Sequence, residues 1–268
     1  MMKLIADSSA NLTMLEGVTY QSVPMTIRAG ERDFVDDETL DTHELLDYLA
    51  AHNGKSGTAC PSLDGWLKAF EGADEIFVIT ITSSLSGTCA SAMAARDVYL
   101  QSHPEVKIHI FDTLSTGPEM QLLAEKLAEL HAKGLPFDVV CEKAQEYLAT
   151  THLFFSLKSL HNLAQNGRVS KIAAGAIGIL GIHILATASL EGTIQPVEKC
   201  RGEKKTCAAM VQKLLVRIHH AENPEAAGAL AASLHGHFPE ADIEIRPCRG
   251  LCSYYAERGG VIVGFETM

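Results

Sequence analysis

The sequence contains no stretch of about 20 uninterrupted apolar residues, the length that a membrane-spanning helix needs. Its most apolar segment, residues 172–190, is interrupted by His183 and by three glycines. The apolar stretch at the N-terminus is too short for the central region of a secretory signal peptide, and Asp7 follows it at once. We therefore expect a cytoplasmic protein without stable insertion in a membrane.

Basic charge is also scarce. Lysine and arginine number 22 against 33 aspartates and glutamates, so the formal net charge is −11 at pH 7, and no run of five like charges occurs. A nucleic-acid-binding surface needs a basic stripe or patch that neutralises phosphates. The sequence therefore argues against a nucleic-acid partner, and only the short basic segment at residues 201–205 suits an acidic partner protein.

Paired cysteines of the kind that bind zinc are missing. The seven cysteines are irregularly spaced, and the nearest pair, Cys248 and Cys252, has three residues between its members. An odd number of scattered cysteines is typical of reduced thiols in a cytosolic protein. We expect no metal site and no cofactor.

Common catalytic motifs are absent as well. There is no GxSxG nucleophile elbow, no GxxxxGK[ST] phosphate loop and no GxGxxG dinucleotide loop. The twelve histidines are dispersed and include no HExxH pair. These absences disfavour an α/β-hydrolase, and they leave the sequence without a common catalytic motif.

The chain does contain enough apolar residues for a large core. It has 268 residues, of which 47% are hydrophobic, and a folded chain of this length buries roughly three quarters of its unfolded surface. Strand and helix patterns alternate in the first half, which predicts an α/β fold with a parallel sheet flanked by helices. We expect strands at 3–6, 21–28, 75–82 and 106–111, and helices at 39–51, 63–70, 89–100, 118–133 and 138–148.

The pattern changes after about residue 150. We expect a strand at 153–157, helices at 158–166, 204–221 and 226–235, and strands at 242–246 and 261–265. This change predicts two lobes, an N-terminal α/β lobe over residues 1–155 and a C-terminal α/β lobe over residues 156–268.

A cluster of hydroxyl side chains follows the apolar strand at 75–82. Residues 82–88 read Thr-Ser-Ser-Leu-Ser-Gly-Thr, with five hydroxyls in seven residues and a helix expected directly afterwards. Hydroxyls and exposed N–H groups at a helix start can bind a carboxylate or phosphate, and Gly87 would let the backbone approach such a ligand. The alternative interpretation is that these side chains only cap the helix.

Two further loops carry candidate ligand groups. Thr58 precedes a helix start at Pro61 and Ser62, which need no help from it to begin that helix. Arg168 follows Gly167 after an expected helix, and its guanidinium either lies in solvent or pairs with an anion. Composition alone leaves both alternatives open for Arg168.

Seven ordered motifs over residues 3–210 resemble the DegV family of bacterial lipid-binding proteins, which has a FakB-like branch. Each motif is similar to a family segment: Asp7-Ser8-Ser9, residues 23–27 with Asp36-Asp37, Thr58 with Pro61-Ser62, residues 82–88, Phe111-Asp112-Thr113, residues 163–170, and residues 199–205. The resemblance implies two α/β lobes that hold one long-chain fatty acid between them. It also implies a carrier without turnover of its own, which in the FakB-like branch presents the fatty acid to a separate kinase for phospholipid synthesis.

The resemblance also implies roles for particular residues. Thr58, Ser83, Ser86 and Gly87 would hold the carboxylate, with Ser84 nearby, while the acyl tail lies in a buried apolar tunnel. Arg168 would face the head group or the kinase.

The C-terminal motif departs from the family pattern. Members commonly carry a histidine near the carboxylate, whereas this chain has Tyr254 and Tyr255 there, and Tyr255 is the expected counterpart. A tyrosine hydroxyl can donate to a carboxylate but does not titrate near neutral pH.

We keep one alternative from another class, a hydrolase or transferase that uses Ser83 or Ser86 as nucleophile on an acyl or phosphorylated substrate. Such an enzyme needs a base, and only Asp7 and Asp112 suggest themselves.

Overall fold

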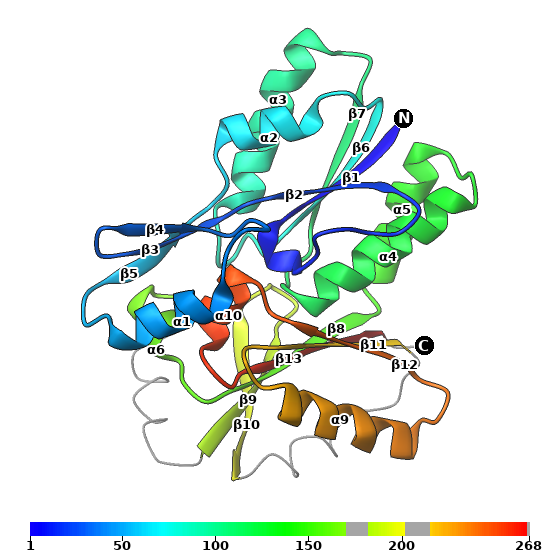
Figure 1. Ribbon diagram of the computed structural model, residues 1–268. Coiled ribbons are helices and arrows are strands. Elements are labelled where there is room, and N and C mark those ends of the chain that lie inside the picture. The colour runs from blue at the N-terminus through cyan, green and yellow to red at the C-terminus, as the bar shows by residue number, and fades with distance from the viewer. Residues whose placement is uncertain (170–181, 202–214, 267–268) are drawn as a thin grey trace.

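The computed structural model describes residues 1–169, 182–201 and 215–266 (Figure 1). Its N-terminal half contains a four-stranded, fully parallel sheet in the order β2-β1-β6-β7. The strands are β1 (Met2–Asp7), β2 (Thr19–Val23), β6 (Glu75–Thr80) and β7 (Lys107–Asp112). The predicted parallel sheet is therefore confirmed.

Helices cover both faces of this sheet because its central strands are apolar on both sides. Along β6, Ile76 and Val78 join one buried cluster, whereas Phe77 and Ile79 join the opposite one. The helices are α2 (Leu63–Phe70) and α3 (Thr88–Ser102) on one face, and α4 (Pro118–Ala132) and α5 (Phe137–Leu148) on the other. The hydroxyl loop, which carries the hydroxyl cluster at residues 82–88, follows the carboxyl end of β6, the end of a parallel strand at which ligands commonly bind.

A small antiparallel sheet interrupts the predicted order. The expected strand at 21–28 is in fact two strands, because Pro24 has no N–H to donate to a ladder and separates them. The part after Pro24 joins a three-stranded sheet in the order β4-β3-β5. Its strands are β3 (Thr26–Ala29), β4 (Arg32–Val35) and β5 (Ser56–Ala59), and α1 (Thr42–Ala51) packs on it.

The second large sheet is mixed and has six strands in the order β10-β9-β8-β13-β11-β12. The strands are β8 (Thr151–Leu157), β9 (Ile182–Ala188), β10 (Ile194–Arg201), β11 (Leu215–His220), β12 (Asp242–Pro247) and β13 (Val261–Glu266). The short α6 (His161–Gln165) and α9 (Pro224–His237) accompany this sheet. The expected lobe boundary at residue 155 falls within β8, and the division into two domains stays a prediction.

The helix predicted at 204–221 is wrong at its C-terminal end. Residues 215–220 form β11, which lies between β13 and β12 with Val216 and Ile218 buried. Because neighbouring strands satisfy its backbone groups on both sides, tertiary context overrides the local helix preference. Residues 204–214 lie outside the described residues.

The helix α10 (Gly250–Ala256) comes from the C-terminal part of the chain but packs on N-terminal elements (Figure 1). The carboxylate of Asp36, which directly follows β4, accepts the N–H groups of Gly250 and Leu251, both at 2.8 Å. Arg249 adds hydrogen bonds to the carbonyls of Leu12 and Asp36. Asp36 is fully buried, so this cap joins distant parts of the chain in the interior.

A second buried polar link involves His219 on β11. Its Nδ1 accepts from Asn11 Nδ2 and its Nε2 donates to Gln121 Oε1, each at 2.8 Å, which sets the neutral tautomer. Burial lowers the pKa of His219 to about 3. The neutral ring therefore bridges the C-terminal sheet, α4 and the loop after β1.

We expect the substitution Asp36→Ala to lower the free energy of unfolding by roughly 3–5 kcal/mol, because it leaves Arg249 and two buried N–H groups without their carboxylate. Denaturant unfolding measures this. The matched control is Asp37→Ala, since the carboxylate of Asp37 is exposed to solvent and accepts hydrogen bonds from nearby Thr39. Equal losses in the two variants would contradict the assignment of Asp36 as the cap of α10.

We expect His219→Gln to be less stable than the unchanged protein at pH 7, with the difference shrinking by roughly 3 kcal/mol towards pH 4. The pKa of His219 is lower in the folded state than in the unfolded one, so its contribution is complete above about pH 6.5 and is lost as the pH falls. Unfolding curves at several pH values measure the difference. A difference that stays constant with pH would show that His219 is not buried neutral.

Candidate functional site

A pocket with about 800 Å³ of empty volume lies where the two large sheets meet. The loops after β6 and β7 line it from the N-terminal half, and β8, β13, α10 and the turn between β9 and β10 line it from the other. Most of the lining is apolar, including Leu153, Phe155, Leu157, Leu163, Ile194 and Ile262.

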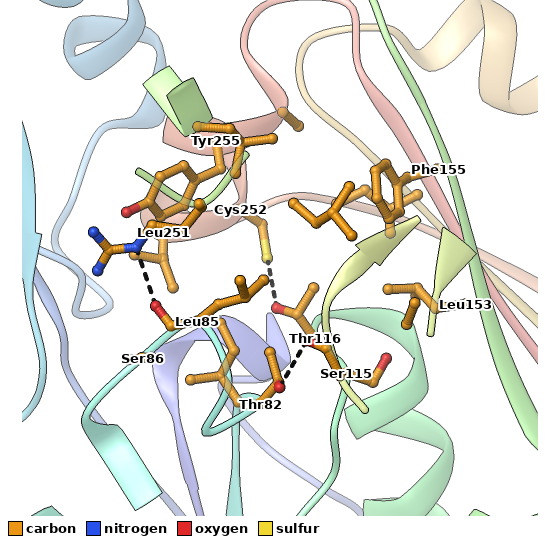
Figure 2. A pocket seen from close by; sticks show the side chains of 18 of the residues that line it. Thr82, Leu85, Ser86, Ser115, Thr116, Leu153, Phe155, Leu251, Cys252 and Tyr255 are labelled. Carbon is orange, nitrogen blue, oxygen red and sulfur yellow. Dashed lines mark hydrogen bonds between the residues drawn. The ribbon is translucent and has the colours of Figure 1, made fainter. Parts of the chain in front are cut away.

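Four of the predicted site residues line this pocket together: Thr58, Ser86, Arg168 and Tyr255. Thr58 lies on β5 and Tyr255 on α10, 197 residues apart, and their hydroxyl oxygens are 3.0 Å from each other. In Figure 2, Tyr255, Leu85 and Ser86 lie at one end of the pocket, and Leu153 and Phe155 lie at the other. The end with Tyr255 and Ser86 therefore joins the hydroxyls of Thr58 and Tyr255, whereas the other end is formed largely by apolar side chains, with Ser115 beside Leu153.

The guanidinium of Arg168 is fixed by backbone carbonyls. Its Nε donates to the carbonyl of Leu85 at 3.1 Å, and its Nη1 donates to the carbonyl of Asn166 at 2.5 Å. Gly167 has a φ of +73°, as expected of a residue that ends α6. No carboxylate in the described part of the chain forms an ion pair with Arg168, so its positive charge is available to an anion in the pocket.

The two neighbouring tyrosines have different surroundings. Tyr254 is fully buried, and its hydroxyl bonds Ser56 Oγ at 2.8 Å and Asn166 Nδ2 at 2.9 Å. Tyr255, in contrast, lines the pocket and reaches Thr58. Of the two tyrosines, the structure thus places Tyr255 in the pocket lining.

The remaining three predicted residues, Ser83, Ser84 and Gly87, lie outside the pocket lining. Ser83 is exposed, and its backbone N–H donates to Asp112. The hydroxyl of Ser84 donates to the carbonyl of Glu191 at 2.5 Å. Gly87 is the N-cap residue of α3, with an ordinary φ of −76°. The side chains of the hydroxyl loop therefore have separate roles, and only part of the loop faces the pocket.

Asp7 and Asp112 support backbone geometry. Asp7 is fully buried and accepts from Ser9 and from the N–H of Ile81 at 2.7 Å, and burial raises its pKa to about 6. Asp112 accepts the N–H groups of Ser83 and Leu114 at 3.0 and 3.2 Å. Neither carboxylate bonds the hydroxyl of Ser83 or Ser86, so within the described residues these serines have no adjacent base.

Several lining residues were not predicted. Leu251 and Cys252 come from α10, and Gly192 and Thr193 come from the turn after β9. The alternation of Leu153, Phe155 and Leu157 on β8 was the available signal for an apolar wall. No comparable local signal marks α10, because its place in the pocket depends on contacts with the distant Asp36.

Two further observations limit the site. Among residues 1–169, 182–201 and 215–266, no helix is long and apolar enough to cross a bilayer. Within the same residues, no group of three or more His, Cys, Asp or Glu side chains is arranged to hold a metal ion.

Comparisons with known proteins agree with the fold and the motifs. The model of the DegV family, described as uncharacterised proteins, matches residues 1–267. A DegV domain-containing protein of Streptococcus pneumoniae is 40% identical over 276 residues, which cover 98% of each chain.

Two solved structures with bound fatty acids are also similar. A DegV family protein of Eubacterium eligens loaded with heptadecanoic acid has a TM-score of 0.98 and 45% identity, with both chains covered completely. The fatty acid kinase (Fak) B3 protein of Streptococcus pneumoniae loaded with linoleic acid has a TM-score of 0.95 and 40% identity, with 99% of each chain covered. These matches confirm the predicted two-sheet α/β fold and the resemblance, and the chain belongs to the DegV family.

Proposed function

We propose that this protein is a cytoplasmic carrier that binds one long-chain fatty acid and presents it to a fatty acid kinase. One observation carries the proposal: a mostly apolar pocket is lined at one end by the hydroxyls of Thr58 and Tyr255 and by the guanidinium of Arg168, which forms no ion pair within the described residues. Relatives that share the fold at 45% and 40% identity hold heptadecanoic acid and linoleic acid. The second of these relatives bears the name of a fatty acid kinase protein, which supports the choice of partner.

The energetics of a fatty acid suit this division of the pocket. Removing a carboxylate from water costs several kcal/mol unless charges and hydrogen bonds replace the water. Arg168 supplies the charge, and Thr58, Ser86 and Tyr255 supply hydroxyl donors. A tail of about 15 methylenes gains roughly 0.8 kcal/mol for each one buried, which offsets the remaining cost of binding.

The carboxylate ligands in this proposal are Thr58, Ser86, Arg168 and Tyr255. Tyr255, which lines the pocket and contacts Thr58, supplies one of the hydroxyl donors of this head-group site. Ser83, Ser84 and Gly87 support the loop without lining the pocket. Because Ser83 and Ser86 have no base beside them in the described residues, we propose a carrier without turnover of its own.

We expect Arg168→Gln and the double variant Thr58→Val with Ser86→Ala each to weaken fatty acid binding by about 10–100-fold, because charge-assisted hydrogen bonds contribute roughly 1.5–3 kcal/mol. Titration of delipidated protein with a C16 fatty acid measures Kd. The fatty alcohol of the same length is the matched ligand, and its Kd should change much less. Arg96→Gln is the control, because Arg96 on α3 bonds Asp97 and lies outside the pocket lining, and it should leave Kd unchanged.

Equal weakening for the acid and the alcohol would contradict the carboxylate assignment, since both ligands share the tail. Wild-type protein that binds neither ligand would contradict the proposed function itself.

We expect Tyr255→Phe to weaken ligand binding and Tyr254→Phe to lower stability. Loss of the Tyr255 hydroxyl should raise Kd for the fatty acid about two- to tenfold, as expected for one hydrogen bond. Loss of the buried Tyr254 hydroxyl removes its hydrogen bonds with Ser56 and Asn166, so the free energy of unfolding should fall by about 1–3 kcal/mol with Kd preserved. Binding titrations and denaturant unfolding measure the two effects. A larger rise in Kd for Tyr254→Phe would show that Tyr255 is not the head-group tyrosine.

A further inference from the structure

The turn between β9 and β10, residues 189–193, is a compact unit that lines the pocket. The N–H of Ser189 donates to the carbonyl of Thr193 at 2.8 Å, and the N–H of Gly192 donates to the carbonyl of Ser189 at 2.9 Å. The hydroxyl of Ser189 accepts the N–H of Thr193 at 3.1 Å. Gly192 and Thr193 belong to the pocket lining. Because these three hydrogen bonds lie within residues 189–193, the turn can move as one body.

Two hydroxyls from the N-terminal half of the chain hold this turn in place. Thr82 donates through Oγ1 to the carbonyl of Gly192 at 2.9 Å, and Ser84 donates through Oγ to the carbonyl of Glu191 at 2.5 Å. Both hydroxyls come from the loop after β6, 107–110 residues away along the chain. These bonds tie the two lobes together over the pocket.

The fit between the turn and that lobe is close. Gly192 has a φ of +74°, and a Cβ atom there would lie 2.2 Å from Thr82 Oγ1 and 3.0 Å from Leu114 Cα. Thr82 and Leu114 also line the pocket. The contact that Gly192 permits therefore forms part of the pocket wall.

The hydrogen bonds that attach the turn are weaker than those that attach α10. In the described residues β10 is the edge strand of its sheet and pairs only with β9. The two hydroxyl-to-carbonyl bonds involve neutral groups, whereas α10 on another side of the pocket is held by the buried carboxylate of Asp36. Neutral hydrogen bonds are weaker than charge-assisted ones, so the turn should separate from its neighbours before α10 does.

We propose that Thr82 and Ser84 are positioning residues that hold the β9–β10 turn closed, and that this turn is the gate through which the ligand enters and leaves. The inference rests on the proposed function, because the ligand concerned is the fatty acid. A gate changes the rates of entry and exit by the same factor, since opening precedes both. A carboxylate ligand instead changes Kd.

The test measures association and dissociation rates of a fluorescent C16 fatty acid with Thr82→Val and Ser84→Ala. We expect kon and koff to rise together, about two- to tenfold for each variant, with Kd unchanged for Ser84→Ala, because Ser84 lies outside the pocket lining. Ser84→Thr, which keeps the hydroxyl, should retain wild-type rates. Ser83→Ala is the matched control, because Ser83 is the exposed neighbour outside the pocket lining, and its rates should also stay at the wild-type values.

Unchanged rates in both variants would overturn the gate, and so would a rise in Kd at constant kon, which would instead assign the hydroxyls to ligand contact. Hydrogen–deuterium exchange of residues 188–194 gives a readout that needs no ligand. We expect faster exchange there in Thr82→Val and Ser84→Ala than in Ser83→Ala. If the wild-type protein bound no fatty acid, the proposed function would fail, and unchanged exchange in these variants would separately show that the hydroxyls do not hold the turn.

Discussion

The pocket depends on one buried carboxylate, that of Asp36 at the N-terminus of α10. Burial raises the pKa of Asp36, while Arg249 and the N–H groups of Gly250 and Leu251 act in the opposite direction and favour the charged form. This cap fixes a helix from the end of the chain against strands from its beginning. Without that attachment, neither Leu251 nor Tyr255 would have a defined place in the pocket wall.

The same attachment explains how distant residues come together at the proposed head-group site. Tyr255 projects from the capped helix towards Thr58 on β5, and Arg168 is directed by the carbonyls of Leu85 and Asn166. Each functional group is therefore positioned by backbone or by a buried polar contact. Such preorganisation lowers the cost of ordering side chains when a ligand binds.

Much of the N-terminal half was predictable because its signals are local. The helix predicted at 63–70 matches α2 at both ends, since Ser62 caps it and apolar residues repeat with helical spacing. The motifs also identified Thr58, Ser86 and Arg168, which all reach the pocket. Local spacing could not show which side chains of the hydroxyl loop face the pocket. Ser84, for example, bonds the carbonyl of Glu191 instead.

The remaining features depend on long-range contacts that one sequence does not display. The segment at 215–220 becomes a strand because two neighbouring strands pair with it, although its local pattern favoured a helix. The helix α10 owes its place to Asp36, more than 200 residues away. The turn at 189–193 reaches the pocket only through the fold of the second sheet.

The most direct test of this account is native mass spectrometry of the purified protein, before and after extraction with organic solvent. We expect a one-to-one mass difference that matches a fatty acid of about 14–18 carbons and that disappears on extraction, since the apolar pocket with its cationic end retains such a ligand. A protein that carries no such adduct, and takes up none when fatty acids are added, would contradict the account.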